Sequence, residues 1–191
     1  MTQANKAALK FLANRRSRPG KTLLKPAPAP AQLAPILAAG LRVPDHGKLE
    51  PWRLIVLTEA ACLRLSDNVV ASGTSGAIDP EKIQKERQLW QNAPLIVAVV
   101  ISPVPSPKIP EFEQILSAGA VCLSLVNAAL ASGWGANWLT SFPAFDRQFL
   151  SALGLAANES IAGFVHMGTE GAAPPERPRP DIATKVTWLD T

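Results

Sequence analysis

The residues with the clearest capacity for chemistry are basic side chains near the start of the chain. They precede the first acidic residue, Asp45, and include Lys6, Lys10, Arg15, Arg16, Arg18, Lys21 and Lys25. A cluster of this kind without neighbouring carboxylates attracts anions, so it predicts a site for a phosphate group or for nucleic acid. A solvated basic segment or an organelle transit peptide, which is also rich in arginine and poor in acid, has the same composition.

A second group of candidates lies in residues 42–52, a loop with two prolines, one glycine and one of the two histidines. Asp45 and His46 are a conceivable acid/base pair, but adjacent side chains rarely face each other, which favours a loop hydrogen bond for His46. His166 lies in an apolar stretch and is interpreted as a core or interface side chain. The sequence shows no Ser-His-Asp arrangement, glycine-rich phosphate loop or metal-ligand spacing.

Composition limits the class of protein. The 191 residues are 47% hydrophobic with a net charge of +4, enough apolar material for a globular core. Two isolated cysteines, Cys62 and Cys122, argue against a disulfide scaffold or zinc site and favour a reducing, cytoplasmic setting. The first residues lack the charged-then-apolar order of a signal peptide. The basic segment has no aromatic interleaving for base stacking, so nucleic acid is not the expected partner.

The long apolar segment 113–140 is predicted to be the central element of the fold. It carries no charge from Gln114 to Phe145, and its apolar residues face all round a helix, which is typical of a helix buried on every side. About twenty such residues also suffice to span a bilayer. The many small and polar residues and the lack of a charged flank make a membrane span the weaker interpretation. Ser132-Gly133 ends the helix, and a short strand or loop around Trp138 follows.

The remaining elements alternate between helix and strand. Hydrophobic periodicity predicts helices at 4–15, 31–41, 59–71, 80–90 and 145–153, strands at 53–57, 94–101 and 160–168, and a mobile turn at 72–76. This order favours an α/β or α+β fold in which helices cover a sheet. Residues 1–191 are expected to form a single domain, with a proline-rich C-terminal arm at about 171–191.

Four motifs in register resemble the FMN-dependent nitroreductase family. They are Arg15-Arg16-Ser17 after the first helix, PDHGKLEPW before the first strand, AGAVCLSLVNAALASGWGANW, and the strand segment GFVHMGT that ends at Thr169. The Pro-Asp-His loop before Pro-Trp is similar to that of the short bacterial NAD(P)H nitroreductase branch. The resemblance covers about residues 9–169. It implies an α+β (α/β-like) fold with a long buried central helix, built as an intertwined homodimer with FMN at the interface.

The resemblance also assigns roles to particular residues. An Arg-x-Ser segment binds the FMN phosphate and ribityl chain in this family, which implies Arg15, Arg16 and Ser17, and guanidinium groups suit a phosphate. The loop adds Arg42 and His46, and the strand near the flavin adds three more residues, Trp138, Leu139 and Thr140. Many members carry a lysine two residues after the serine, where this chain has Pro19. Lys21, another cation or backbone donors would then have to stabilise the reduced flavin.

The activity implied by the resemblance is electron transfer from NAD(P)H through FMN to nitroaromatic, quinone or similar small acceptors. Donor and acceptor would use the site in turn, with ping-pong kinetics, and no catalytic side chain is required because the chemistry belongs to the cofactor. A flavin-binding carrier or sensor without turnover is the alternative, and a nucleic-acid-binding module is a third class. The leading hypothesis expects a cytoplasmic homodimer that binds neither nucleic acid nor membrane.

Overall fold

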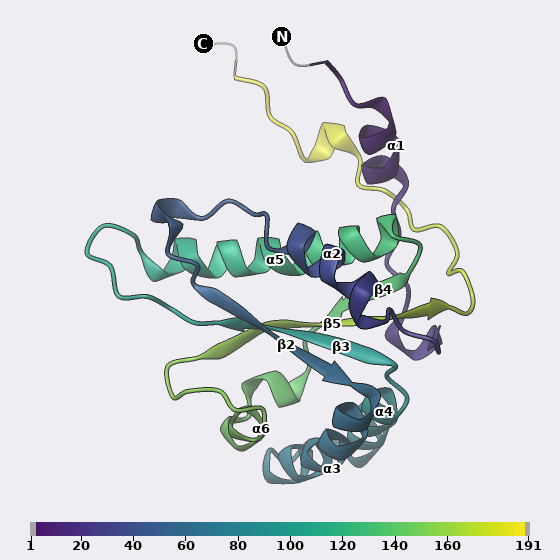
Figure 1. Cartoon of the computed structure of the whole chain (residues 1–191), viewed down its shortest axis with the longest axis vertical. Coiled ribbons are helices and arrows are strands. Elements are labelled where there is room, and N and C mark those ends of the chain that lie inside the picture. The colour runs from purple at the N-terminus through teal and green to yellow at the C-terminus, as the bar shows by residue number, and fades with distance from the viewer. Residues whose placement is uncertain (1–2, 190–191) are drawn as a thin grey trace.

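A computed structural model describes residues 3–189 as an antiparallel sheet with helices on both faces (Figure 1). The strands are β1 (Leu23–Leu24), β2 (Trp52–Thr58), β3 (Leu95–Ile101), β4 (Gly135–Leu139) and β5 (Ser160–Glu170). β5 lies in the middle, because β1, β3 and β4 all pair with it, and β2 extends the sheet beyond β3. All pairings are antiparallel, which confirms the predicted sheet covered by helices and selects α+β.

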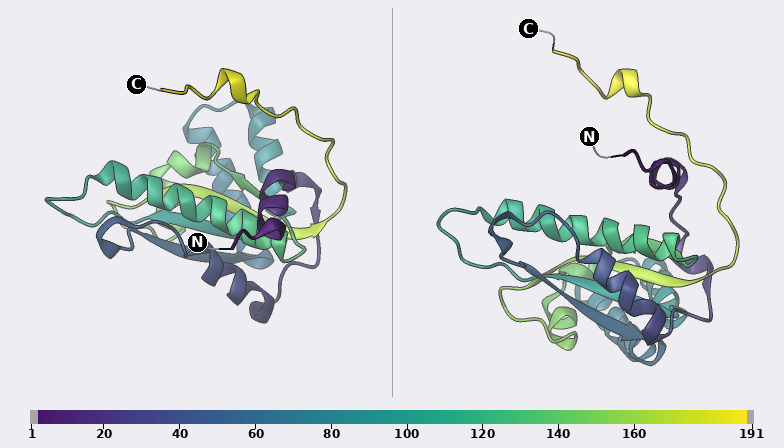
Figure 2. Two further views of the ribbon diagram at one scale, coloured as in Figure 1. Left: turned by 90° about the horizontal axis from the view of Figure 1, so that it is seen from above. Right: turned by 45° about the horizontal axis from the view of Figure 1, so that its top comes forward.

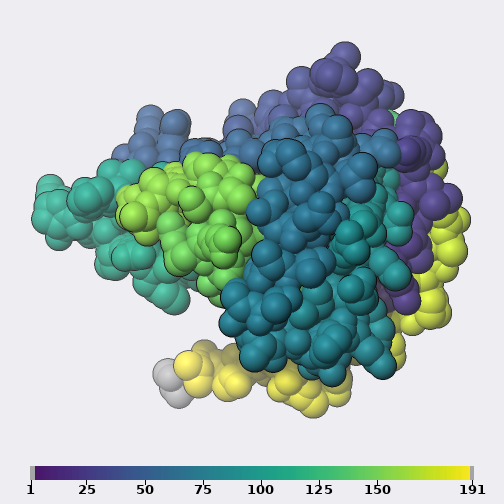
Figure 3. Space-filling view, turned by 90° about the horizontal axis from the view of Figure 1, so that it is seen from below, coloured from purple at the N-terminus to yellow at the C-terminus, as the bar shows by residue number. Residues whose placement is uncertain are grey.

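The helices form two layers around this sheet. They are α1 (Lys6–Asn14), α2 (Pro30–Gly40), α3 (Glu59–Ser75), α4 (Pro80–Gln91), α5 (Glu111–Ala131) and α6 (Arg147–Ala152), with short 3₁₀ turns η1 (Gly20–Thr22), η2 (His46–Lys48), η3 (Phe142–Phe145) and η4 (Ile182–Thr184). α2 and α5 cover one face, and α3, α4 and α6 cover the other. Figure 3 shows the second face, where the purple N-terminal segment borders the blue and teal helices.

The C-terminal boundary of α3 differs most from the sequence prediction. The mobile turn expected at 72–76 is wrong, because α3 continues to Ser75. Serine and glycine suit this end of the helix since it packs closely on α4. A Cβ atom on Gly73 would lie 2.5 Å from Ile83, so only the smallest residue permits the approach.

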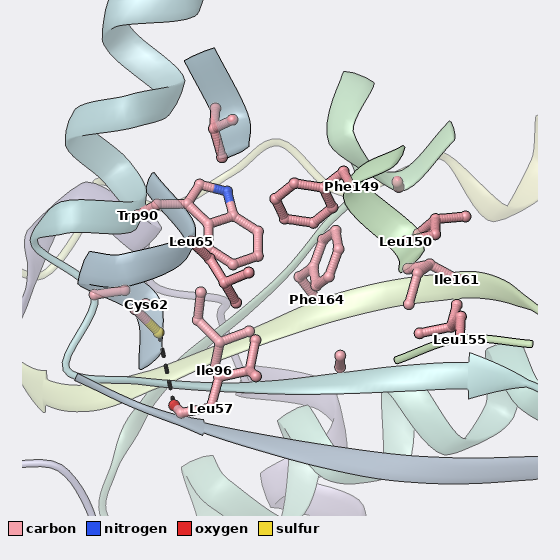
Figure 4. Close-up of a cluster of buried hydrophobic side chains, with 14 of the residues drawn as sticks. Leu57, Cys62, Leu65, Trp90, Ile96, Phe149, Leu150, Leu155, Ile161 and Phe164 are labelled. Atoms are coloured by element: carbon pink, nitrogen blue, oxygen red, sulfur yellow. Dashed lines mark hydrogen bonds between the residues drawn. The ribbon is translucent and has the colours of Figure 1, made fainter. Parts of the chain in front are cut away.

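Trp90 at the end of α4 is the largest fully buried side chain of the α3–α4–α6 face (Figure 4). Its ring meets Phe149 and Phe164 edge-on, with centroid distances of 5.2 and 5.1 Å. The indole Nε1 donates a hydrogen bond to Glu86 Oε1 at 3.0 Å, so its polar atom is satisfied. Edge-to-face contacts of this kind add to the free energy gained from burying apolar area.

Replacing Trp90 with alanine is expected to reduce the free energy of unfolding by about 3–5 kcal/mol, because the cavity loses both aromatic contacts. Urea denaturation of the two proteins measures the difference. Leu63→Ala is the control, since Leu63 on α3 is 55% exposed and its loss should cost about 0.5 kcal/mol or less. Equal losses for the two variants would contradict a core centred on Trp90.

α5 covers the other face of the sheet, with only one side of the helix buried. Its inner side, including Val121, Cys122 and Leu125, packs on α2, β3 and β5. Its outer side carries exposed apolar residues, Phe112 (67% exposed), Ile115 (42%), Leu116 (56%) and Leu123 (47%). The prediction of burial on every side is therefore wrong for one chain, because the sheet can cover only one side. By length and composition alone α5 also suffices to cross a membrane, yet its inner side is core.

An ion pair between Arg53 and Glu159 connects the edge strand β2 to the loop before β5. Arg53 Nε and Nη2 donate to the two carboxylate oxygens of Glu159 at 2.7 Å each, and Arg147 Nη1 donates to the Glu159 carbonyl at 2.8 Å. The Glu159 side chain is only 7% exposed. The hydrogen bonds from Arg53 lower the pKa of Glu159 from 4.5 to about 2.

Glu159→Gln is expected to reduce the free energy of unfolding by about 2 kcal/mol at neutral pH, because a charged hydrogen-bonded pair is lost. The folded pKa is depressed, so this contribution is present above pH 4.5 and disappears as the pH falls from about 4.5 to about 2. Urea denaturation at pH 7 and pH 3 should show the gap narrowing at low pH. Glu81→Gln, at a carboxylate 83% exposed, is the control. A gap that stays constant would contradict the role of this ion pair.

Both ends of the described chain extend from the body on the same side (Figure 2). α1 has no buried residue, and its apolar Leu9 and Leu12 are 70% and 55% exposed. After Gly171 the proline-rich arm runs past α1, exposed along nearly its whole length. The arm was expected to reach residue 191, and its last two residues lie outside the described range.

Candidate functional site

The arginine segment is fixed beside the edge of β4. Arg18 N donates to the carbonyl of Ala136 at 2.9 Å, and Arg18 Nε lies 2.6 Å from Glu170 Oε1 on β5. Within the segment, Arg15 Nη2 donates to Ser17 Oγ at 2.8 Å, and Arg18 Nη1 donates to the carbonyl of Arg16. Arg15 and Ser17 of the predicted phosphate motif are thus bonded to each other, and Arg16 is bonded to Arg18.

Positive charge accumulates here without full compensation. Burial lowers the pKa of Arg15, and the nearby charges of Arg179, Arg16 and Arg18 lower it further. The Nε atoms of Arg15 and Arg16 are buried and have no hydrogen-bond partner in residues 3–189. Arginine stays protonated under such conditions, so an anion would relieve both the repulsion and the unpaired donors.

Arg179 was missed when the sequence was considered alone. It belongs to the C-terminal arm and pairs with Glu176 at 3.0 Å while acting electrostatically on Arg15. The available signal was the pair of basic residues in ERPRP, within a tail that shows no helical or strand periodicity. Their spatial relation to Arg15, some 160 residues earlier in the chain, could not be read from composition.

A pocket of about 500 Å³ begins where the arginine segment ends. Its walls are largely apolar and include Pro19, Leu89, Leu139 and Phe142, while lysines stand at its margin. This volume lies in the range typical of small-molecule sites. The pocket therefore offers an apolar space that adjoins the arginine segment at Pro19.

The three residues predicted on β4 and just beyond it do not share one surface. Successive side chains of a strand point to opposite faces. Leu139 lines the pocket beside Pro19, whereas Trp138 and Thr140 line a second pocket of about 580 Å³ on the outer side of α5. Trp138 Nε1 donates to the Ala162 carbonyl at 3.2 Å, and a Cβ on Gly163 would lie 1.9 Å from that nitrogen. Gly163 is thus required for the indole to lie flat on β5.

The loop of His46 lies at the other end of α5. His46 Nδ1 is 2.7 Å from Glu113 Oε2 in the first turn of the helix, and Ser117 Oγ donates to the Pro44 carbonyl at 2.7 Å. Gly47 adopts φ of +71°, and a Cβ there would lie 2.5 Å from Ile109. A pocket of about 350 Å³ lies between His46 and α5. These hydrogen bonds and the positive φ of Gly47 fix the conformation of the loop, as is common for loops at functional sites.

One chain does not bring all the predicted residues together. His46 contacts Glu113 at the start of α5, whereas the arginine segment binds Ala136, five residues after the helix ends. The helix between these points is about 27 Å long. Arg42 lies between them, because Gly40 packs on Leu125 and the loop then follows α5 towards its start. Arg42 is exposed and forms no ion pair within the described residues.

Residues 12–169 match the family model described as "Nitroreductase family". The chain belongs to this family. It is 35% identical over 162 residues to the protein named Putative NAD(P)H nitroreductase YdjA of Escherichia coli K12, covering 85% of this chain and 87% of that one. A Haemophilus influenzae protein named Putative NAD(P)H nitroreductase is 34% identical over 185 residues, covering 95% and 99%. The family resemblance drawn from the four motifs is therefore confirmed.

Solved structures agree on the fold. The nitroreductase-like family protein of Bacillus cereus superposes with a TM-score of 0.82 at 22% identity, covering all of both chains. A Bacteroides fragilis nitroreductase with bound FMN gives a TM-score of 0.75 at 19% identity, covering 98% of this chain and 100% of that one. At such identities the likeness establishes the nitroreductase fold.

Other reactive groups of the chain are poorly placed for catalysis. Burial raises the pKa of Cys62 and Cys122 to about 12, so both remain thiols at neutral pH. His166 is 2% exposed, and burial lowers its pKa to about 4, which keeps the imidazole neutral. Its interpretation as a core side chain is confirmed. Residues 3–189 hold no cluster of three His, Cys, Asp or Glu side chains suited to a metal ion.

Proposed function

We propose that the protein is an FMN-dependent oxidoreductase that transfers electrons from NAD(P)H to nitroaromatic, quinone or similar small acceptors. The observation that carries the proposal is the arginine cluster beside β4, which holds buried unpaired donors and adjoins an apolar pocket. The FMN in the Bacteroides fragilis structure and the names of the NAD(P)H nitroreductase relatives support the same cofactor and donor. FMN would supply the chemistry, accepting hydride from the donor and passing electrons to the acceptor.

The protein residues would bind and orient the cofactor. Within residues 3–189 the Nε atoms of Arg15 and Arg16 have no partner and would donate to the phosphate, and Ser17, which Arg15 holds, would contact the ribityl chain. Leu89 and Leu139 offer apolar contact for a flat ring and exclude water from it. Arginine forks and apolar walls together match the two ends of FMN, so the residues present fit this cofactor.

A homodimer would complete the site. The outer side of α5 is an apolar surface, and a two-fold axis across it would place the start of one α5 beside the end of the other. His46 and Arg42 of the partner subunit would then approach the arginine segment. The exposed arm and α1 of each chain, both on one side of the body, would add to the same contact.

The site would serve donor and acceptor in turn. The apolar pocket is open on one side, and no side chain with a general acid or base role is required for hydride transfer to a flavin. Sequential use of one site predicts ping-pong kinetics. The free thiols favour a cytoplasmic setting, and the buried inner side of α5 favours a core helix over a membrane span.

The visible absorption spectrum of the purified protein before and after anaerobic NADPH tests the proposal. Yellow protein that is bleached by NADPH is the expected result. Yellow protein that stays oxidised would instead support a flavin carrier or sensor. Colourless protein that takes up no added FMN would contradict the cofactor assignment.

A further inference from the structure

Glu86 on α4 is the one carboxylate among the described residues that line the pocket bounded by Leu89 and Leu139. Its Oε1 atom accepts hydrogen bonds from Trp90 Nε1 at 3.0 Å and from Ser141 Oγ at 2.5 Å. Trp90 is fully buried, and Ser141 lies just after β4, so the carboxylate is held from both the core and the sheet. The Glu86 side chain therefore has a defined orientation in the pocket wall.

The second carboxylate oxygen of Glu86, Oε2, has no partner within residues 3–189. It accepts no hydrogen bond there, and Glu86 forms no ion pair. An ionised carboxylate only accepts hydrogen bonds, and each of its oxygens has room for more than one donor. Oε2 is therefore the acceptor atom that Glu86 offers to a molecule bound in the pocket.

The cofactor that the proposed function assigns to this pocket has a group that matches this acceptor. The isoalloxazine ring of FMN carries a ring N–H group, and its two-electron reduction adds negative charge near N1. A hydrogen bond from a ring N–H would satisfy Oε2, and it would be strengthened by the charge of the carboxylate. The same charge would oppose the negative charge that reduction adds. Hydrogen bonds to the ring nitrogens and charges near them are the means by which a protein tunes a flavin.

We propose that Glu86 orients FMN through a hydrogen bond from a ring N–H to Oε2, and that its negative charge makes the reduced cofactor a stronger electron donor. This inference rests on the proposed function, because it names a residue that acts on the cofactor of that site. Lys21, Lys82 and Lys85 also line the pocket, and their charges act in the opposite direction. A substitution at Glu86 leaves these lysines in place and so isolates the effect of the carboxylate.

Glu86→Gln removes the charge but keeps Oε1 as an acceptor for Trp90 and Ser141. The affinity of the apoprotein for oxidised FMN is measured by quenching of flavin fluorescence, and the midpoint potential of the bound flavin by anaerobic equilibration with a reference dye. We expect the affinity for oxidised FMN to fall about tenfold, because a charge-assisted hydrogen bond is lost. The ratio of the affinities for reduced and oxidised FMN should rise about tenfold, which for a two-electron couple raises the midpoint potential by about 30 mV.

Two further variants assign the shift in potential to the charge of Glu86. Glu86→Asp keeps a carboxylate at this position, so it should raise the midpoint potential by less than Glu86→Gln does. Glu59→Gln is the matched control, because Glu59 on α3 is 51% exposed and pairs with Lys25 outside the pocket. It should change neither the FMN affinity nor the midpoint potential.

The two readouts separate the inference from the proposed function. A Glu86→Gln protein with the wild-type midpoint potential would overturn the inference even if it binds FMN more weakly, because Glu86 would then act only by holding Trp90 and Ser141. A midpoint potential that falls in this variant would overturn it as well. Wild-type protein that binds no FMN would contradict the proposed function itself, and the inference with it.

Discussion

Arg15→Ala is expected to raise the FMN dissociation constant by about 100-fold, because charge-assisted hydrogen bonds to the phosphate would be lost. Arg15 also holds Ser17 through a 2.8 Å hydrogen bond, so its loss should free a second residue of the site. Folding should change little, since α1 has no buried residue and the Arg15 side chain is surrounded by like charges. Titration of apoprotein with FMN, followed by quenching of flavin fluorescence, measures the effect.

Two further variants sharpen this experiment. Arg15→Lys keeps the charge but loses the fork of donors, so its dissociation constant should lie between those of wild type and Arg15→Ala. Arg64→Ala removes an exposed arginine on α3 that does not line the pocket, and it should leave FMN binding unchanged. If Arg15→Ala binds FMN as tightly as Arg64→Ala does, the phosphate site lies elsewhere.

Local patterns predicted the elements of the fold well. The alternation of helical and strand patterns predicted a sheet covered by helices, and all seven residues of β3 are buried. The predictions that proved wrong depend on tertiary contacts, which local sequence patterns do not reveal. Ser72 and Gly73 have low helix propensity, but the close approach of Ile83 keeps them helical. The sequence of α5 is the same whether the helix is buried on every side or exposes part of its apolar surface. Local sequence patterns therefore could not predict its exposed outer side.

For the candidate site, too, the residues that are close in sequence could be predicted, whereas those that the fold brings together could not. The absence of acidic residues before Asp45 pointed to the anion site, and the motif identified Arg15 to Ser17 within it. Successive side chains of a strand point to opposite faces, so Leu139 and Trp138 of β4 lie on different faces of the sheet. This could be predicted once the residues of β4 were known. By contrast, Arg179 and the lysines of α4 reach this region only through the fold. Because these residues are far from Arg15 in the sequence, no sequence pattern indicates that they lie near it.

Leu123→Glu is expected to separate the dimer and release FMN together. Leu123 is 47% exposed on the outer side of α5, so a carboxylate there can remain hydrated in one chain. Within an apolar dimer interface the same carboxylate would be buried without a partner, at a cost of several kcal/mol. The dimer dissociation constant should therefore rise by about 100-fold or more. Sedimentation across a range of concentrations measures it, and circular dichroism checks that the monomer is folded.

The FMN content of that variant decides whether two chains share the site. Leu63→Glu is the matched control, because Leu63 is 55% exposed on α3, on the face remote from α5. It should remain dimeric and retain FMN. A Leu123→Glu protein that is monomeric yet binds FMN as wild type does would show that His46 and Arg42 act within their own chain or not at all. If that variant remains dimeric, the apolar side of α5 does not form the interface. Loss of FMN only where the dimer is lost would place the arginine segment of one chain and the His46 loop of the other around one cofactor.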